Sequence, residues 1–175
     1  MYRLMLADDE RATREGILSG MNWRKLGIAP VDAATNGLDA LEQAERNAPD
    51  ILLTDIKMPK MNGIELAKQI RQLNPYCSLL IISGYPEKGI LRSAIQLRAI
   101  NFVDKPVELP QLDEQLQLAV AEQDSMHERR DLLRDELGFL LSQKVADAGK
   151  INALKAKLYP GETTDLQRPF AASHS

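Results

Sequence analysis

The stretch ILLTDIKMPKMNG, residues 51–63, begins as a short apolar run and changes character at an acid. Asp55 closes the run, and Pro59 and Gly63 follow within the next eight positions. A short apolar run bounded by turn-forming residues is typical of a buried strand followed by a loop. Pro59 fixes φ, and we expect Gly63 to supply a conformation that other residues resist. The stretch therefore predicts a strand that ends in a carboxylate, and a loop that bends away and leaves the acid open.

Strand-like and helix-like patterns alternate on both sides of this stretch. Apolar runs predict strands at 2–7, 31–34, 51–54, 79–82 and 101–103. Between and after them, apolar residues at helical spacing predict helices that begin near residues 10, 38, 64, 90 and 109. This alternation indicates βαβ units, an α/β fold in which helices cover both faces of a parallel sheet.

The composition excludes several classes of protein. With 44% hydrophobic and 27% charged residues the chain is an ordinary globular one, and its net charge of −3 argues against a DNA-binding domain within it. The single cysteine, Cys77, excludes an intrachain disulfide and fits a reducing compartment. No apolar run approaches the ~18 residues of a membrane span, and acids come too early for a signal peptide. We expect a cytoplasmic protein that does not enter a membrane.

Polar residues lie directly after, or two positions after, the ends of four of the predicted strands: Asp8-Asp9, Asp55, Ser83 and Lys105. Open parallel sheets bind ligands beyond the carboxyl ends of their strands. If the first and third strands are neighbours, three carboxylates converge and repel one another unless a cation such as Mg²⁺ joins them. Lys105 adds an ammonium suited to a phosphate, and Ser83 adds a hydroxyl donor. The set predicts a carboxylate nucleophile that attacks a phosphoryl group with Mg²⁺ assistance.

Four separately placed motifs match one family in order and spacing: DD at 8–9, DIKMPKMNG from Asp55, SG at 83–84 and FVDKP at 102–106. Over roughly residues 1–122 the chain resembles the receiver domain of two-component response regulators. Residues 20–30 lengthen the connection after the first predicted helix, as in the receivers of AraC-type (helix-turn-helix) regulators. The resemblance implies a flavodoxin-like, doubly wound (βα)5 sheet with strand order 2-1-3-4-5 and a C-terminal helical extension.

The resemblance also assigns roles to single residues. Asp55 would be the phosphoacceptor of a sensor histidine kinase, in a switch rather than an enzyme, with only slow self-dephosphorylation. The other implied roles are Mg²⁺ binding by Asp8, Asp9, Asp55 and the Lys57 backbone carbonyl, phosphate contact and switching by Ser83, Lys105 and Phe102, a cis bond before Pro106, and shaping of the loop by Pro59 and Gly63.

Other interpretations compete with the phosphorylation switch. Asp8-Asp9 could merely cap the first helix, but this leaves the remaining motifs unexplained. A phosphatase-type hydrolase also carries an aspartate after a strand, but usually adds a second acid two residues later, where this chain has Lys57. A dimerisation scaffold with a vestigial receiver would show the same oligomer with and without a phosphate mimic.

An apolar seven-residue repeat extends beyond the receiver. It predicts a helix that extends beyond the receiver domain and pairs with a partner there, although an exposed, solvated helix is the alternative. Gly149 is expected to end this helix before a second, short one. The predicted divisions are a receiver at 1–122, a helical linker or coiled coil at 123–158, and a disordered tail at 159–175. The repeat comprises Leu109, Leu112, Leu116, Ala119, Met126, Leu133, Leu137, Leu140, Ile151, Leu154 and Leu158, and is interrupted at Gln123, Arg130, Lys144 and Asp147.

The output of the switch is less determined by the sequence. We expect a homodimer through the face of the fourth helix, fifth strand and fifth helix, through the C-terminal helix, or through both. The resemblance to AraC-type regulators implies control of transcription, with a DNA-binding domain after the linker. No such domain is expected within this chain, so DNA binding requires a domain beyond Ser175. The alternative is phosphorylation-gated dimerisation or partner binding without DNA.

Overall fold

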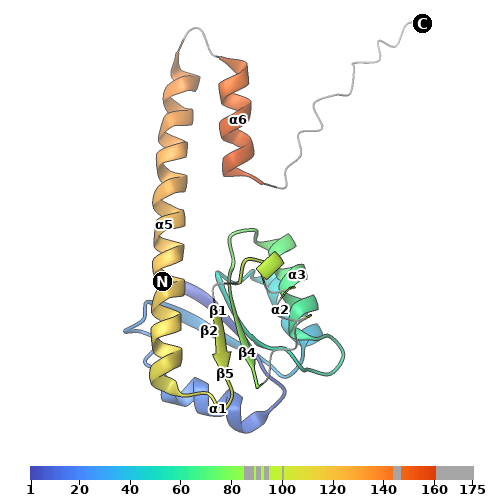
Figure 1. Cartoon of the computed structure of the whole chain (residues 1–175). Helices are drawn as coiled ribbons and strands as arrows, with labels where there is room; N and C mark the ends of the chain where they lie inside the picture. The colour runs from blue at the N-terminus through green and yellow to red at the C-terminus, as the bar shows by residue number, and fades with distance from the viewer. Residues whose placement is uncertain (85–88, 90–91, 93–94, 100, 144–146, 161–175) are drawn as a thin grey trace, which may run out of the picture. The chain divides into compact units, whose positions relative to one another are not determined.

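The computed structural model describes residues 1–84, 89, 92, 95–99, 101–143 and 147–160. Its centre is a five-stranded parallel sheet in the order β2-β1-β3-β4-β5, which confirms the predicted fold and strand order (Figure 1). β1 and β3 are hydrogen-bonded neighbours, as the convergence of the acids requires. The strands are β1 (Tyr2–Ala7), β2 (Ile28–Ala34), β3 (Ile51–Asp55), β4 (Ser78–Ser83) and β5 (Asn101–Asp104).

Helices cover both faces of the sheet. α1 (Arg11–Gly20) and the first part of α5 (Leu109–Ser142) pack on the face that carries Leu4 and Leu6 of β1. α2 (Gly37–Arg46) and α3 (Gly63–Leu73) pack on the opposite face, which carries Met5 and Ala7. Because successive strand residues point to opposite faces, a strand buried on both sides is apolar throughout. All residues of β3 and β4 are accordingly buried.

The second strand begins earlier than the sequence predicted, at Ile28 rather than Val31. Pro30 lies inside β2, although proline cannot donate to a ladder. β2 is an edge strand, and its register against β1 shifts between Tyr2 and Leu4, opposite this part of β2. Proline is tolerated at an edge.

The fourth predicted helix, near residues 90–97, falls mostly outside the described residues. The fifth predicted strand is present as β5, which pairs with β4. None of the described helices is both long enough and apolar enough to cross a membrane.

The chain divides into two compact units, Met1–Met126 and His127–Ser175, and the division falls within α5. In the first unit, the predicted apolar stripe of α5 is confirmed, since Leu112, Leu116 and Ala119 are buried. Gln123, which interrupts that stripe in the sequence, is buried as well.

The second unit contains the end of α5 and α6 (Ala148–Leu158), which buries Ile151, Leu154 and Leu158. The expectation that Gly149 ends a helix was wrong, because Gly149 lies in the first turn of α6. Asp147 starts that helix, since its Oδ1 accepts a hydrogen bond from Lys150 N at 3.1 Å. The predicted disordered tail lies, from residue 161 onward, outside the described residues.

Candidate functional site

Three carboxylates meet at the carboxyl edge of the sheet. Asp8 directly follows β1, Asp55 ends β3, and the two strands are paired up to Ala7 and Thr54. One oxygen from each of Asp8, Asp9 and Asp55 lies within 4.8 Å of the other two. Asp8 and Asp55 are buried, whereas Asp9 is exposed. The site is therefore buried on the side of the sheet and open to solvent at Asp9.

Lys105 brings its ammonium group to these acids. Its Nζ lies 2.8 Å from Asp55 Oδ2 and 3.3 Å from Asp8 Oδ2. Its backbone N donates to Ser83 O at 3.1 Å, which ties the turn after β5 to the end of β4. The Lys105–Pro106 peptide bond is cis, the form that the resemblance implied. The structure thus brings together residues from three strand ends that are far apart in the sequence.

The electrostatics of the site leave a surplus of negative charge. Burial raises the pKa of Asp8, and the Asp55 charge raises it further, against the opposing effects of the Glu10 backbone N–H and Lys105. Burial would lower the pKa of Lys105, but the hydrogen bond to Asp55 and the charges of Asp8 and Asp55 outweigh it, so that pKa is raised. The ammonium is therefore held in its charged form, and Asp8 carries the cost of ionising next to a second acid.

These residues fit a hard divalent cation. Within the part of the chain that is described, Asp8 Oδ2 is a buried oxygen that accepts no hydrogen bond and is approached by Lys105 only as an ion pair. A buried carboxylate oxygen with spare acceptor capacity, next to two more carboxylates, is the donor set that Mg²⁺ takes in proteins. The sequence prediction of a cation site is compatible with this geometry.

The loop after Asp55 approaches that residue closely, and the expected role of Gly63 needs correction. Gly63 has no unusual φ; instead, a Cβ there would lie 2.0 Å from the Asp55 carbonyl oxygen. The positive φ of this loop, 68°, belongs to Lys60. Asn62 caps α3 in a capping box with Glu65, so the helix begins directly against the phosphoacceptor candidate. Gly63 is needed because there is no room for a side chain.

Ser83 and Phe102 flank the site on the β4–β5 side. Ser83 is the buried last residue of β4, so its hydroxyl group lies at the same edge as Asp55. Phe102 is half-buried and packs against the cluster of Ile56, Ile64 and Ile81.

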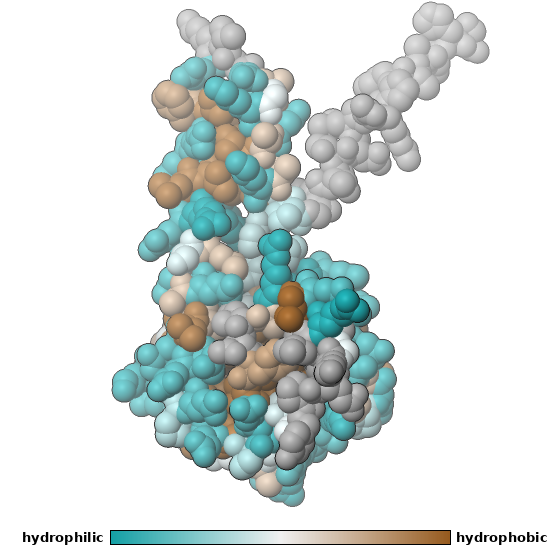
Figure 2. Space-filling view, in the orientation of Figure 1, coloured by the Kyte–Doolittle hydropathy of each residue, from teal (hydrophilic) through white to brown (hydrophobic). Residues whose placement is uncertain are grey.

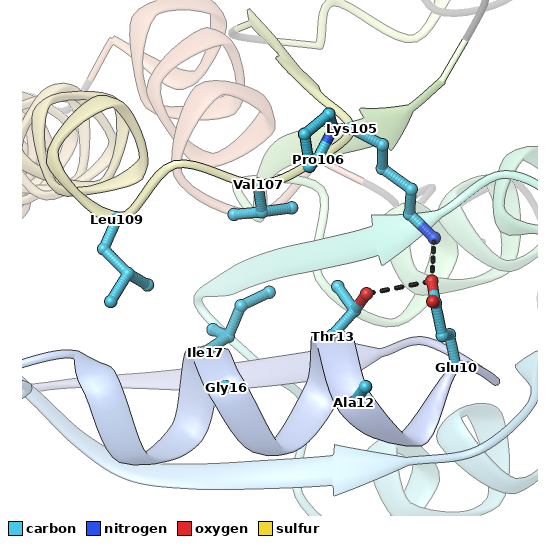
Figure 3. A pocket seen from close by; sticks show the side chains of 9 residues that line it. All are labelled: Glu10, Ala12, Thr13, Gly16, Ile17, Lys105, Pro106, Val107 and Leu109. Atoms are coloured by element: carbon cyan, nitrogen blue, oxygen red, sulfur yellow. Dashed lines mark hydrogen bonds and ion pairs between the residues drawn. The ribbon is translucent and has the colours of Figure 1, made fainter.

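The site contains two further residues, Glu10 and Thr13, that were not predicted from the sequence. Glu10 Oε2 lies 3.4 Å from Lys105 Nζ and accepts a hydrogen bond from Thr13 Oγ1 at 2.9 Å (Figure 3). The pKa of Glu10 is lowered by Thr13 and Lys105. The sequence places Glu10 directly after Asp8 and Asp9, which could have indicated that it belongs to the site. Nothing in the sequence indicates that Glu10 pairs with Lys105.

A groove of about 640 Å³ opens beside Lys105. Figure 3 shows α1 on one side of it and the segment after β5 on the other, with Glu10 and Lys105 at the end nearest the acids. The lining residues are otherwise small or apolar: Ala12, Thr13, Gly16, Ile17, Pro106, Val107 and Leu109.

Cys77 is not part of any reactive site. It is fully buried, and burial raises the pKa of its thiol to about 12. A protonated thiol with no access to solvent is inert. The position two residues after Asp55, where a phosphatase-type hydrolase usually carries a second acid, holds the exposed Lys57.

Comparisons with known proteins agree with this geometry. The response regulator receiver domain family matches residues 4–117. An uncharacterized transcriptional regulatory protein of Bacillus subtilis (strain 168), YesN, is 32% identical over 145 residues, which are 81% of this chain and 39% of that protein. The chain spans less than half the length of the curated relatives it matches.

Two solved structures are also similar. The crystal structure of a two component transcriptional regulator AraC from Clostridium phytofermentans ISDg is 34% identical with a TM-score of 0.65, over 74% of this chain and 99% of that one. The REC domain of AraT, a response regulator from Geobacillus stearothermophilus, is 33% identical with a TM-score of 0.64, over 73% and 98% of the two chains.

Proposed function

This chain belongs to the response regulator receiver domain family and resembles the receivers of AraC-type regulators, and we propose that it accepts a phosphoryl group on Asp55 from a sensor histidine kinase. The observation that carries the proposal is the convergence of Asp8, Asp9 and Asp55 with Lys105 at one sheet edge. Slow self-dephosphorylation is the only turnover we expect. A cytoplasmic location is part of the proposal, because the free thiol of Cys77 suits a reducing compartment.

The transfer needs no further reactant. A carboxylate oxygen of Asp55 attacks the phosphorus of a phosphohistidine, and an acyl phosphate P–O bond forms as the P–N bond breaks. The electron pair of the broken bond stays on the histidine nitrogen, which takes up a proton. Lys105 Nζ, 2.8 Å from Asp55, pairs with the phosphoryl oxygens, and the Ser83 hydroxyl donates to them. Asp8, Asp9, Asp55 and the Lys57 carbonyl would hold Mg²⁺, which would supply positive charge to offset that of the phosphoryl oxygens.

The groove beside Lys105 is our candidate for the docking site of the kinase. Most of the residues that line it are small or apolar, and one end of it lies next to the acids. A kinase helix lying in this groove would therefore present its phosphohistidine to Asp55. Gly16 of α1 leaves the groove open, because a Cβ added there would meet nothing within 4 Å. A Cβ can therefore be added at Gly16 without a clash, and Gly16 is a position from which a longer side chain would enter the groove.

The output that we propose is control of transcription, through a change at Ser83, Phe102 and the β5–α5 face that alters pairing with a second copy. The transcriptional regulators among its relatives support the first part. The second part is supported by α5 beyond the receiver, where Leu133, Leu137 and Leu140 are only half-buried. Figure 2 shows apolar surface among the charged groups of this segment, where Leu132, Phe139 and Leu141 are exposed. Two copies would bury these side chains.

A phosphodonor assay tests the phosphoacceptor proposal. The full chain is incubated with acetyl phosphate and Mg²⁺, and its intact mass is compared with those of Asp55→Asn and Asp104→Asn. Asp104 is an exposed acid at the end of β5 and serves as the matched control. We expect one phosphoryl group on the wild type and on Asp104→Asn, and none on Asp55→Asn. Equal labelling of Asp55→Asn, or no labelling of the wild type, contradicts the proposal.

A further inference from the structure

Three consecutive residues of α5 are hydrogen-bonded to the sheet at the edge opposite the acids. We call Glu122, Gln123 and Asp124 the exit anchor, because they lie just before Met126, where the first compact unit ends. Gln123 has only 2% of its surface exposed. A buried amide is costly unless it is hydrogen-bonded, so its partners decide what it does.

Gln123 binds the beginnings of two central strands. Its Nε2 lies 2.7 Å from Tyr76 O, 2.8 Å from Ser78 Oγ and 3.0 Å from Asp50 O. Asp50 directly precedes β3, and Ser78 is the first residue of β4. One side chain thus joins α5 to the beginnings of β3, the central strand of the sheet, and of its neighbour β4.

The neighbours of Gln123 bind two strands as well. Ser78 Oγ donates to Glu122 Oε2 at 2.5 Å, and the Tyr2 hydroxyl donates to Asp124 Oδ1 at 2.5 Å. Consecutive helical residues are about 100° apart around the axis, since a turn takes about 3.6 residues. Contacts from three consecutive positions to β1, β3 and β4 can therefore form together in only one rotational setting of the helix.

An apolar residue at position 123 would not have this effect. Leucines on a helix pack on a sheet over a range of rotations and translations, because hydrophobic contact is not directional. Hydrogen bonds to fixed carbonyls are directional and allow little of that range. The polar interruption of the apolar stripe therefore has a function that the apolar positions Leu116 and Ala119 cannot supply.

The anchor also shares a strand with the proposed switch. β4 begins at Ser78, which binds Glu122 and Gln123, and ends at Ser83, beside Lys105. We propose that Gln123 is a positioning residue that fixes the rotation of α5 where it leaves the receiver, so that phosphorylation changes the following segment only while this anchor is intact. The inference rests on the proposed phosphorylation of Asp55.

The test uses the full chain with Gln123→Leu and, as a matched control, Gln117→Leu. Gln117 lies on the same helix, is exposed, and donates within the helix to Asp113. Hydrogen–deuterium exchange of amides in residues 127–142 is measured with and without beryllofluoride and Mg²⁺, and acetyl phosphate labelling is followed by intact mass. Ser78→Ala, which removes two of the anchor's hydrogen bonds and little volume, replaces Gln123→Leu if that variant does not fold.

We expect wild type and Gln117→Leu to change exchange in residues 127–142 on adding beryllofluoride. Gln123→Leu should still be labelled by acetyl phosphate but lose that change. A response of Gln123→Leu equal to that of Gln117→Leu overturns the inference, as does a labelled wild type with no change in residues 127–142. Absence of labelling in the wild type instead overturns the proposed function, so the two failures are distinguishable.

Discussion

Two glycine-to-alanine substitutions should change stability in opposite directions. Gly16 lies inside α1, where alanine has an intrinsic advantage of about 0.5–1 kcal/mol over glycine, whereas Gly63 is the first residue of α3, where this advantage is smaller. At Gly16 nothing lies within 4 Å of the added Cβ, so we expect that gain to appear in full. At Gly63 the Cβ would lie 2.0 Å from Asp55 O and 2.9 Å from Asp55 C. Both atoms are backbone at the end of a buried strand and cannot move aside.

The start of α3 would then have to move away by roughly 1 Å, a strain of the kind that costs about 1–3 kcal/mol. The movement also weakens the hydrogen bond from Gly63 N to Ile56 O, now 2.9 Å. We expect Gly63→Ala to be less stable than Gly16→Ala by roughly 2–4 kcal/mol, a difference in Tm of several degrees.

Urea denaturation followed by circular dichroism measures this difference, with unchanged m-values as the check that the same transition is compared. Equal stability of the two variants would refute the close approach of α3 to Asp55. Gly63→Ala should also be phosphorylated more slowly, since the displaced helix borders the acceptor.

Three further predictions concern the site itself. Lys105→Met leaves the Asp8 and Asp55 carboxylates without their ammonium, so we expect a loss of about 1–3 kcal/mol in the free energy of unfolding and slower labelling by acetyl phosphate. The control variant Lys57→Met, at an exposed lysine, should change the free energy of unfolding by less than ~0.5 kcal/mol. Equal losses of stability in Lys105→Met and Lys57→Met would contradict the ion pairs of Lys105 with Asp8 and Asp55. Burial raises the pKa of Asp8 above its ordinary 3.8, so the folded protein binds the carboxyl proton of Asp8 more tightly than the unfolded chain does. The protonated Asp8 therefore contributes stability at low pH, and this contribution is lost as the pH rises through the raised pKa. Asp8→Asn should therefore be more stable than wild type at neutral pH without Mg²⁺, and urea denaturation should show this gain disappearing below pH 3.8; a gain that persists there would exclude ionisation as its cause. Gly16→Leu fills the groove of Figure 3, so transfer from a phosphorylated histidine kinase should slow at least several-fold while labelling by acetyl phosphate is unchanged; equal slowing of both would show that the groove is not the docking site.

The arrangement of the acids was predictable because it follows from topology. A parallel sheet aligns the carboxyl ends of its strands, so Asp8, Asp55 and Ser83 had to share an edge once β1 and β3 were neighbours. Strand ends were harder to predict where one residue contradicted its surroundings. The start of β2 is an example, since Pro30 lies inside the strand and the sequence does not show that β2 is an edge strand, where proline is tolerated.

Contacts between residues that are far apart in the sequence could not be predicted from the sequence alone. Gln123 looked like an interruption of an apolar stripe, since nothing in the sequence brings its amide to the carbonyls of Asp50 and Tyr76. Glu10 was not assigned to the site from the sequence, although it pairs with Lys105. Gly63 was assigned a conformational role because its steric neighbour, the Asp55 carbonyl, is unknown until the chain folds.

The central claim is that Asp55 becomes an acyl phosphate. Reduction with borohydride converts the carbonyl carbon of an acyl phosphate to an alcohol, so a phosphorylated aspartate is read as homoserine by tandem mass spectrometry. After treatment with acetyl phosphate and Mg²⁺, we predict homoserine at position 55 and unmodified aspartate at Asp8 and Asp9. Homoserine at position 8 or 9, or at no position of the wild-type chain, would contradict the account.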